Sequence, residues 1–405
     1  MSEPLRFTTE LAVSPAQVYF ALTNSTGIAS WLGNDVRSDP RPGGRFYVWW
    51  QEGYYTAGEY VELVENERLL VRWHGKDEPA SSQVTFELRP VRSGTELTVT
   101  HGDLGTGADW DEARTALQKG WENGLADLKS VLEDGLPVAL KKQPLLGISG
   151  GNGISPEVAA QLNVPVSEGF QIAGIIPGLG AEAAGLAAND VVVQFAGQPI
   201  KDWPTLQALV SQQVGGDIVP VTVYRGPEKI ELDLTLSARP VLPVVSTGDA
   251  IADQVEGNYA QMLAELRALF VDAGAAANQR PAEDEWSADE VLAHLIQVEQ
   301  WAHMWLNMAI NGLPGTGYGG NWNPWIEAMT GLRSGTDELL AEYEKQCQVS
   351  VAMLRALPVE FLQRRFTYNN IGHMFALGLP NHTRNHFGQI LAAIQTAQAA
   401  AVPAD

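Results

Sequence analysis

Residues 174–191 read GIIPGLGAEAAGLAANDV, and this stretch decides the fold of the middle of the chain. Glycine and proline at Pro177, Gly178, Gly180 and Gly185 mark tight turns. Around it, residues 145–236 alternate short strand-like runs with glycine turns and two short helical patterns. This texture predicts a compact, β-rich domain.

The residues that follow this stretch extend the pattern. They are Phe195-Ala-Gly197-Gln-Pro-Ile200, a predicted helix at about 204–214, and a predicted strand pair over 219–236. Taken together, these motifs resemble the PDZ domain of HtrA-type proteases over residues 143–240. One departure is Asn189, where that family usually has glycine. Because asparagine tolerates positive φ better than most residues, we expect the turn to be kept.

The PDZ resemblance implies a binding function. Such a domain adds a partner's C-terminal peptide to an exposed sheet edge and holds the terminal carboxylate with backbone N–H groups. Carried over, residues 145–148 form the carboxylate loop, in which Gly147 allows close backbone approach. The predicted peptide-binding residues are Leu146, Gly147, Ile148, Leu206 and Val210. The alternative is a PDZ fold that packs internally and binds nothing.

The segment 147–151, GISGG, also resembles the nucleophile segment of chymotrypsin-like proteases. Such an enzyme needs a double barrel upstream that carries histidine and aspartate. The upstream segment is too short for this and has a different pattern, so we expect no serine protease.

Two proline-bearing seams divide the chain. They are GLPVALKKQP at 135–144 and SARPVLPVVSTGD at 237–249. With 405 residues, two or three domains are expected. We therefore predict a multidomain α+β protein with domains over 1–137, 143–240 and 246–400.

Composition narrows the function classes. The net charge of -22 disfavours phosphate backbones and anionic lipid, so we expect neither a nucleic-acid nor a membrane partner. Cys347 is the single cysteine, which rules out an internal disulfide and fits a reducing compartment. The first residues lack a signal-peptide pattern, and no run approaches about 18 apolar residues. We expect a cytoplasmic protein and leave a homodimer open.

The first segment combines a short helix opened by Ser14-Pro15, four or five strand-like runs, and a long helix at about 109–133. It resembles the START/SRPBCC superfamily, in the branch similar to the activator of a heat-shock chaperone ATPase. The resemblance rests on Pro15 with Val18, Gly43-Gly44-Arg45-Phe46, Gly58-Glu59-Tyr60-Val61, Leu70-Val71-Arg72-Trp73, Gly94-Thr95-Glu96-Leu97 and Gly120-Trp121.

This resemblance implies a helix-grip fold, an α+β sheet wrapped round its last helix, often with an apolar cavity. Trp31, Trp73 and Trp121, with Trp49 and Trp50, are candidates to line such a cavity and to hold a small apolar ligand. The alternative is that they are ordinary core aromatics. His74 and His101 lie at predicted strand ends, and we interpret both as surface or capping residues.

The last segment, 247–400, holds four long amphipathic patterns that predict an all-α four-helix bundle. Ser287 and Glu290 form a capping box at the start of the second helix, and His294 follows two turns later. His382 and His386 are four residues apart, so one helix face can present both to a metal ion. A third ligand from a neighbouring helix would leave an open coordination position.

This pattern resembles the DinB-like superfamily of four-helix bundles, which includes thiol-dependent S-transferases. Carried over, His294, His382 and His386 bind a divalent metal, such as zinc, nickel, manganese or iron, and Gln389 supports them. The open position would hold water or a thiolate. The alternative is three hydrogen-bonded core histidines. We place His303 outside the site, leave His373 as a candidate fourth contact, and interpret Cys347 as a buried apolar residue. The glycine-rich loop with Trp322 and Trp325 is either a lid or a plain connection.

Three hypotheses follow for the whole chain. The first is a multidomain binding protein that joins peptide recognition, a metal-binding bundle and a ligand- or partner-binding domain. The second is a metal-dependent thiol S-transferase or hydrolase in the bundle. The third is a stress-linked co-chaperone.

Overall fold

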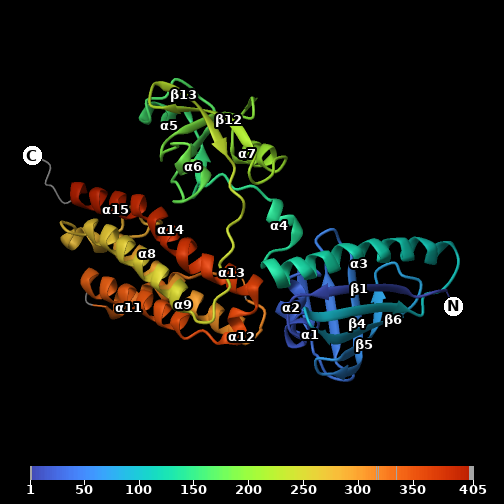
Figure 1. The fold of residues 1–405 in the computed structure, drawn as a ribbon. Helices are drawn as coiled ribbons and strands as arrows, with labels where there is room; N and C mark the ends of the chain where they lie inside the picture. Colours follow the sequence, from blue (N-terminus) through green and yellow to red (C-terminus); the bar gives the residue numbers. More distant parts are fainter. Residues whose placement is uncertain (1, 316, 318, 334, 401–405) are drawn as a thin grey trace, which may run out of the picture. The chain divides into compact units, whose positions relative to one another are not determined.

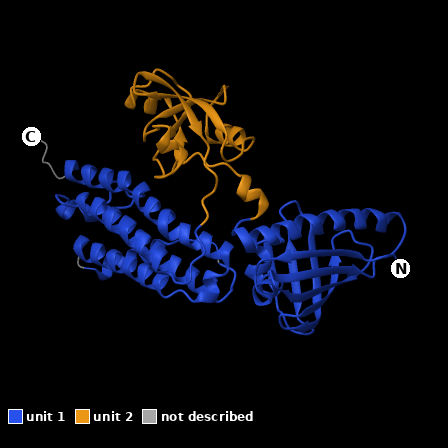
Figure 2. Cartoon of the chain, in the orientation of Figure 1, with its two compact units in different colours: residues 1–136, 242–405 blue, residues 137–241 orange. Residues whose placement is uncertain are grey.

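The computed structural model describes residues 2–315, 317, 319–333 and 335–400. These form two compact units, one of residues 2–136 with the described residues of 242–400, and one of residues 137–241 (Figure 2). Antiparallel sheets occupy the first 240 residues and helices the remainder, which confirms the multidomain α+β prediction.

The N-terminal part is a seven-stranded antiparallel sheet in the order β1-β7-β6-β5-β4-β3-β2, with a long helix along it (Figure 1). Helix α1 begins as predicted, with Ser14 as its N-cap and Pro15 as its first residue, and Gln17 completes a capping box with Ser14. Helix α3 ends at Gly135, which has φ of 82°. The elements are β1 (Leu5–Leu11), α1 (Pro15–Thr23), α2 (Ser25–Ala29), β2 (Asp35–Ser38), β3 (Arg45–Trp49), β4 (Tyr55–Val64), β5 (Arg68–Gly75), β6 (Ser82–Val91), β7 (Gly94–Gly102) and α3 (Ala108–Asp134).

The middle unit is a sheet in the order β13-β12-β10-β9-β8, so β8 is an edge strand. Asn189 has φ of 70°, which confirms the turn expected there. The neighbouring Asp190 is buried and pairs with Arg225 at 2.7 Å. The elements are α4 (Val138–Lys142), β8 (Gly151–Gly153), α5 (Pro156–Gln161), β9 (Phe170–Ile172), α6 (Gly180–Ala183), β10 (Val191–Phe195), β11 (Gln198–Pro199), α7 (Trp203–Val210), β12 (Ile218–Arg225) and β13 (Glu228–Thr235). Helix α7 is shorter than predicted, because residues after Val210 turn.

The C-terminal part packs long helices around one apolar core. Its elements are α8 (Asp249–Ala268), a 3₁₀ turn (Gly274–Asn278), α9 (Ala288–Ile310), α10 (Asn323–Leu332), α11 (Thr336–Arg355), α12 (Val359–Leu362), α13 (Arg365–His373), a π-helical turn (Met374–Gly378), α14 (Leu379–Asn385) and α15 (Phe387–Ala400). Among the described helices, none is long and apolar enough to cross a bilayer.

The fourth long pattern consists of successive helical segments, α13, the π-helical turn, α14 and α15. Pro380 has no N–H to donate to the carbonyl of Ala376, one turn earlier. The side chain of Asn258, from α8, donates to that carbonyl at 2.6 Å. The π-helical turn absorbs the disruption, and α14 then sets the direction of the histidines that follow.

Candidate metal centre

The position of His294 is fixed by the start of α9. The Ser287 hydroxyl accepts a hydrogen bond from the N–H of Glu290, and the Glu290 carboxylate accepts one from the N–H of Ser287 at 2.8 Å. Arg280 pairs with the same carboxylate. His294 therefore lies on a well-capped helix and is buried, with 7% of its surface exposed.

His382 and His386 come from the other side of the bundle. His382 lies in α14, and His386 is the residue at which α14 ends and α15 begins. Helix α14 is held to α11 by a buried hydrogen bond of 2.6 Å between the hydroxyls of Tyr343 and Thr383. This bond places His382, the neighbour of Thr383, against α9.

The three histidines converge on one point. A ligand atom from each lies within 4.8 Å of those of the other two. The Nε2 atoms of His294 and His382 are 3.2 Å apart. Two nitrogens bound at ~2.0–2.1 Å to one tetrahedral ion are separated by about 3.3 Å, so this pair already has the spacing of a metal site.

The electrostatics favour neutral imidazoles. Burial, followed by the neighbouring His386 and His382, lowers the pKa of His294 to about 4. Burial, followed by His386, lowers the pKa of His382 to about 4. Because a metal binds the neutral imidazole, both rings are ready to bind near neutral pH.

Gln389 fixes the tautomer of His386. The Nδ1 of His386 is 2.8 Å from the Gln389 Oε1, which can only accept. Nδ1 therefore carries the proton, and Nε2 keeps its lone pair for a metal. The donor set thus fits a three-nitrogen site, and the supporting role of Gln389 toward a metal stays a prediction.

A cavity adjoins the cluster. It has a volume of about 400 Å³, and its lining includes Trp286 and Gln389. The Trp286 ring lies against His294, with ring centroids 5.3 Å apart. The Trp286 side chain thus lies between the cavity and His294, and the Gln389 side chain lies between the cavity and His386.

The other bundle residues singled out in the sequence lie elsewhere. His303 is 2.7 Å from the Ser350 hydroxyl, and Cys347 is buried, as expected. His373 is not among the converging histidines of the described chain. Trp325, on α10, packs against the bundle core. A lid role for the glycine-rich loop stays a prediction.

Sequence reasoning missed a buried polar cluster in the same bundle. Glu299 is 1% exposed and accepts hydrogen bonds from Tyr259 at 3.0 Å and from Ser350 at 2.8 Å. Burial raises its pKa to about 7. A signal was present, because Glu299 interrupts the apolar helical spacing of Leu295, Ala302 and Leu306.

In the N-terminal part, Trp31, Trp73 and Trp121 are buried core residues. They do not line any of the four main cavities of the described chain. The indole N–H of Trp31 donates to the Ala21 carbonyl, and that of Trp73 donates to the Glu78 carboxylate. The indole N–H of Trp121 donates to His101. These bonds favour the core alternative.

His101 corrects a second expectation. It is fully buried rather than at the surface, whereas His74 is exposed. Its Nδ1 accepts from Trp121 at 3.0 Å, so its Nε2 donates to the Ser82 hydroxyl at 2.7 Å. Burial lowers the pKa of His101 to about 4. The strand end was predicted correctly, but the helix that covers it could not be seen in the local pattern.

In the middle unit, Gly147 has φ of 86°, a backbone conformation that favours glycine, and its part in a carboxylate loop stays a prediction. Leu146, Ile148 and Val210 are partly buried against the core. Leu206 corrects the predicted set, because it is 1% exposed and belongs to the core. The helix side of a groove would therefore consist of Val210 with Leu209.

Comparison with known families assigns each segment. Residues 12–133 match the family described as activator of Hsp90 ATPase homolog 1-like protein. Residues 152–236 match the PDZ domain, and residues 249–390 match the DinB superfamily. The three-domain fusion expected from the sequence is confirmed, in the same order.

Curated relatives match about a quarter of the chain. The periplasmic pH-dependent serine endoprotease DegQ of Escherichia coli is 28% identical over 95 residues, 24% of this chain and 21% of the relative. A probable periplasmic serine endoprotease DegP-like from Marinomonas is 33% identical over 92 residues, 23% of this chain and 20% of the relative. The chain thus spans about a fifth of the length of these relatives.

Solved structures resemble about a third of the chain. One is protein MLL2253 from Mesorhizobium loti, which is 24% identical with a TM-score of 0.30. The alignment covers 33% of this chain and 98% of MLL2253. Another is the Aha1 dimer from Colwellia psychrerythraea, which is 21% identical with a TM-score of 0.30. The alignment covers 33% of this chain and 98% of the Aha1 chain.

Proposed function

We propose that this fusion of an Hsp90-activator-like domain, a PDZ domain and a DinB-type bundle binds a divalent metal in the bundle and recruits protein partners by their C-terminal peptides. The observation that carries the metal proposal is the convergence of His294, His382 and His386, with ligand atoms within 4.8 Å of one another. Zinc, nickel or iron would suit three imidazole donors, whereas manganese prefers oxygen ligands.

The chain's own residues supply the binding chemistry. His294 and His382 offer neutral rings because burial lowers the pKa of each. Gln389 holds His386 in the binding tautomer. When bound, a metal with three protein ligands would lower the pKa of a thiol or water at its open position.

A second candidate function is thiol S-transfer or hydrolysis in the bundle. It is favoured by the cavity of about 400 Å³ whose walls, Trp286 and Gln389, touch the histidines. A substrate in this cavity would lie one side chain from the metal. A co-chaperone role for the N-terminal domain is a prediction that depends on the family match alone.

The peptide-binding part of the proposal is supported by the edge strand β8. It has one neighbour in the sheet, β9, so a partner strand can add to its other side. The loop at Gly147 has the left-handed backbone that lets N–H groups turn toward a carboxylate. Ile148 and Val210 supply apolar surface beside it.

Metal content is the first test of the proposal. The purified chain, after incubation with zinc and desalting, is expected to hold about one equivalent of metal by mass spectrometry. The variant His382→Ala, His386→Ala should hold none. His303→Ala is the matched control, because it removes a half-buried histidine of the same bundle that lies outside the cluster.

Two results would refute the metal site. One is a parent chain that retains no zinc, nickel, manganese or iron. The other is equal loss of metal in the His303→Ala control and in the double variant. A metal-loaded chain would then be assayed for thiol transfer and hydrolysis, with the double variant as the blank.

A further inference from the structure

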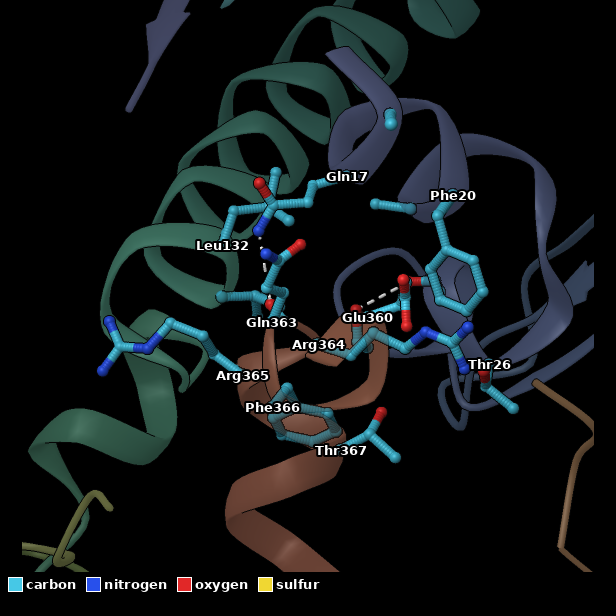
Figure 3. Close-up of a pocket in the computed structure, with 15 residues that line it drawn as sticks. Gln17, Phe20, Thr26, Leu132, Glu360, Gln363, Arg364, Arg365, Phe366 and Thr367 are labelled. Carbon is cyan, nitrogen blue, oxygen red and sulfur yellow. Dashed lines mark hydrogen bonds between the residues drawn. The ribbon is translucent and has the colours of Figure 1, made fainter. Parts of the chain in front are cut away.

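A second cavity lies in the unit that contains both the N-terminal sheet and the bundle, away from the histidines. Its volume is about 180 Å³. One side comes from α1, α2 and the end of α3, and the other from α12 and the start of α13 (Figure 3). It is distinct from the tryptophan-lined cavity predicted in the sheet.

The cavity has the size and walls for a single aromatic ring. A protein cavity of about 150 Å³ with apolar walls can hold benzene. Here the apolar walls are Phe20, Val131, Leu132 and Phe366. A ring with a small substituent therefore fits the space.

The polar end of the cavity is Arg364. Its guanidinium lies 4.1 Å from the centre of the Phe20 ring. Its Nη1 donates to the carbonyls of Ala309 and Ile310, at the end of α9. No hydrogen bond from its Nε or Nη2 to the protein is found in the described part of the chain.

Among the described residues, none forms an ion pair with Arg364. Glu360 lines the same cavity and its charge acts to raise the pKa of Arg364, but Glu360 is exposed and no ion pair joins the two side chains. Arg364 is half-buried, and this burial lowers the pKa of its guanidinium from the ordinary value. A half-buried arginine with free N–H groups is a good partner for a carboxylate, which it can bind through two parallel hydrogen bonds.

We propose that this cavity binds a small aromatic carboxylate, with the ring against the apolar walls and the carboxylate on the free N–H groups of Arg364. Thr26 and Thr367 also line the cavity, and the Thr26 hydroxyl already donates to the Asn24 Oδ1. Because the walls come from both parts of the unit, the bound molecule would contact the N-terminal domain and the bundle at once.

The chain offers a matched control for Arg364. The adjacent Arg365 also lines the cavity, but Figure 3 shows its side chain extending away from Phe20, and it donates to the carbonyl of Glu133. Replacing each arginine by methionine removes one charge from the same segment, but only Arg364→Met removes the charge that faces the ring.

The test measures benzoate binding to the full chain by titration calorimetry, with benzyl alcohol as the uncharged analogue. Benzoate should bind saturably and at least about ten-fold more tightly than benzyl alcohol. Arg364→Met should abolish that preference, whereas Arg365→Met should keep it. Ala16→Trp, which places an indole in the cavity from an exposed position of α1, should block both compounds.

Several results would overturn the proposal. They are no benzoate binding to a folded parent chain, equal affinity for benzoate and benzyl alcohol, or benzoate binding that Ala16→Trp leaves unchanged. If Arg364→Met does not fold because it lacks the hydrogen bonds of Arg364 to α9, the Ala16→Trp variant still tests whether benzoate binds in this cavity.

Discussion

The Nε2 atoms of His294 and His382 lie 3.2 Å apart, although 88 residues separate them in the sequence. Neither ring carries a positive charge near neutral pH, because burial lowers the pKa of each to about 4. Two neutral imidazoles face each other with His386 beside them, which is the arrangement a metal ion can bridge.

Zinc should therefore stabilise the parent chain against heat. A ligand present at a hundred times its dissociation constant stabilises the folded state by about 2.7 kcal/mol. We expect the midpoint of the bundle's thermal transition to rise by a few degrees with zinc. His294→Ala should abolish the rise and His303→Ala should preserve it. Equal rises in both variants would contradict a site at His294.

Gln389 should tune the affinity for metal. Residues that orient a histidine ligand typically contribute 10–100-fold to affinity, so we expect Gln389→Leu to weaken zinc binding by roughly that factor. Gln389→Glu keeps an oxygen acceptor for the Nδ1–H of His386 and should restore most of the affinity. A competition titration with a zinc chelator measures both. Unchanged affinity in Gln389→Leu would show that the tautomer is fixed in another way.

Stability of the N-terminal sheet should fall in acid because of His101. Its folded pKa is about 4, against an ordinary value of 6.5, so protonation favours the unfolded chain. The stabilisation is complete above pH 6.5 and decreases as the pH falls toward 4. From about pH 7 to about pH 5 we expect a loss of roughly 2 kcal/mol.

Hydrogen exchange of peptides from β7 and α3 measures this effect, with His101→Gln as the comparison. The variant has no group that titrates in this range at that position, so its opening free energy should depend less on pH than that of the parent. Parallel pH profiles in the two proteins would rule out His101 as the cause.

Glu299 should act in the opposite direction in the bundle. Its folded pKa is about 7, against an ordinary value of 4.5, so the folded chain prefers the neutral acid. The stabilisation is complete below pH 4.5 and is lost as the pH rises through 7. Between about pH 5 and about pH 8 the bundle should lose roughly 2 kcal/mol, measured by exchange of α9 and α11 peptides. Glu299→Gln should remove this dependence, and a variant that retains it would show that another group titrates.

Peptide capture by the middle unit should depend on Gly147. A Cβ at this position would lie 2.8 Å from the Cβ of Leu179 and would be strained at φ of 86°. We expect Gly147→Ala to weaken binding of a labelled peptide that ends in Leu-Val by more than about ten-fold in fluorescence anisotropy.

Gly197→Ala is the matched control for this experiment. Gly197 has φ of 76°, but a Cβ there would meet no atom within 4 Å. The control should therefore share the backbone strain and still bind. The same peptide with an amidated C-terminus should bind to neither protein, and tight binding of the amide would contradict capture of a carboxylate.

Local sequence patterns were sufficient to predict features that depend only on neighbouring residues. The capping boxes at Ser14 and Ser287 and the positive φ at Asn189 all follow from neighbouring residues, and the structure has each of them. The predicted helix over 109–133 agrees with α3 (Ala108–Asp134), because its apolar spacing marks one buried face.

The sequence by itself determined the three domain types and their order, and it selected the three histidines, because turn glycines, helix caps and apolar periodicity are set by near neighbours. Only the tertiary structure decided which polar groups are buried. His101, Glu299 and Arg364 acquire their environments from helices more than a turn away in sequence, and Leu206 moves from groove to core for the same reason. Burial and pairing depend on contacts between distant segments, which no local pattern encodes.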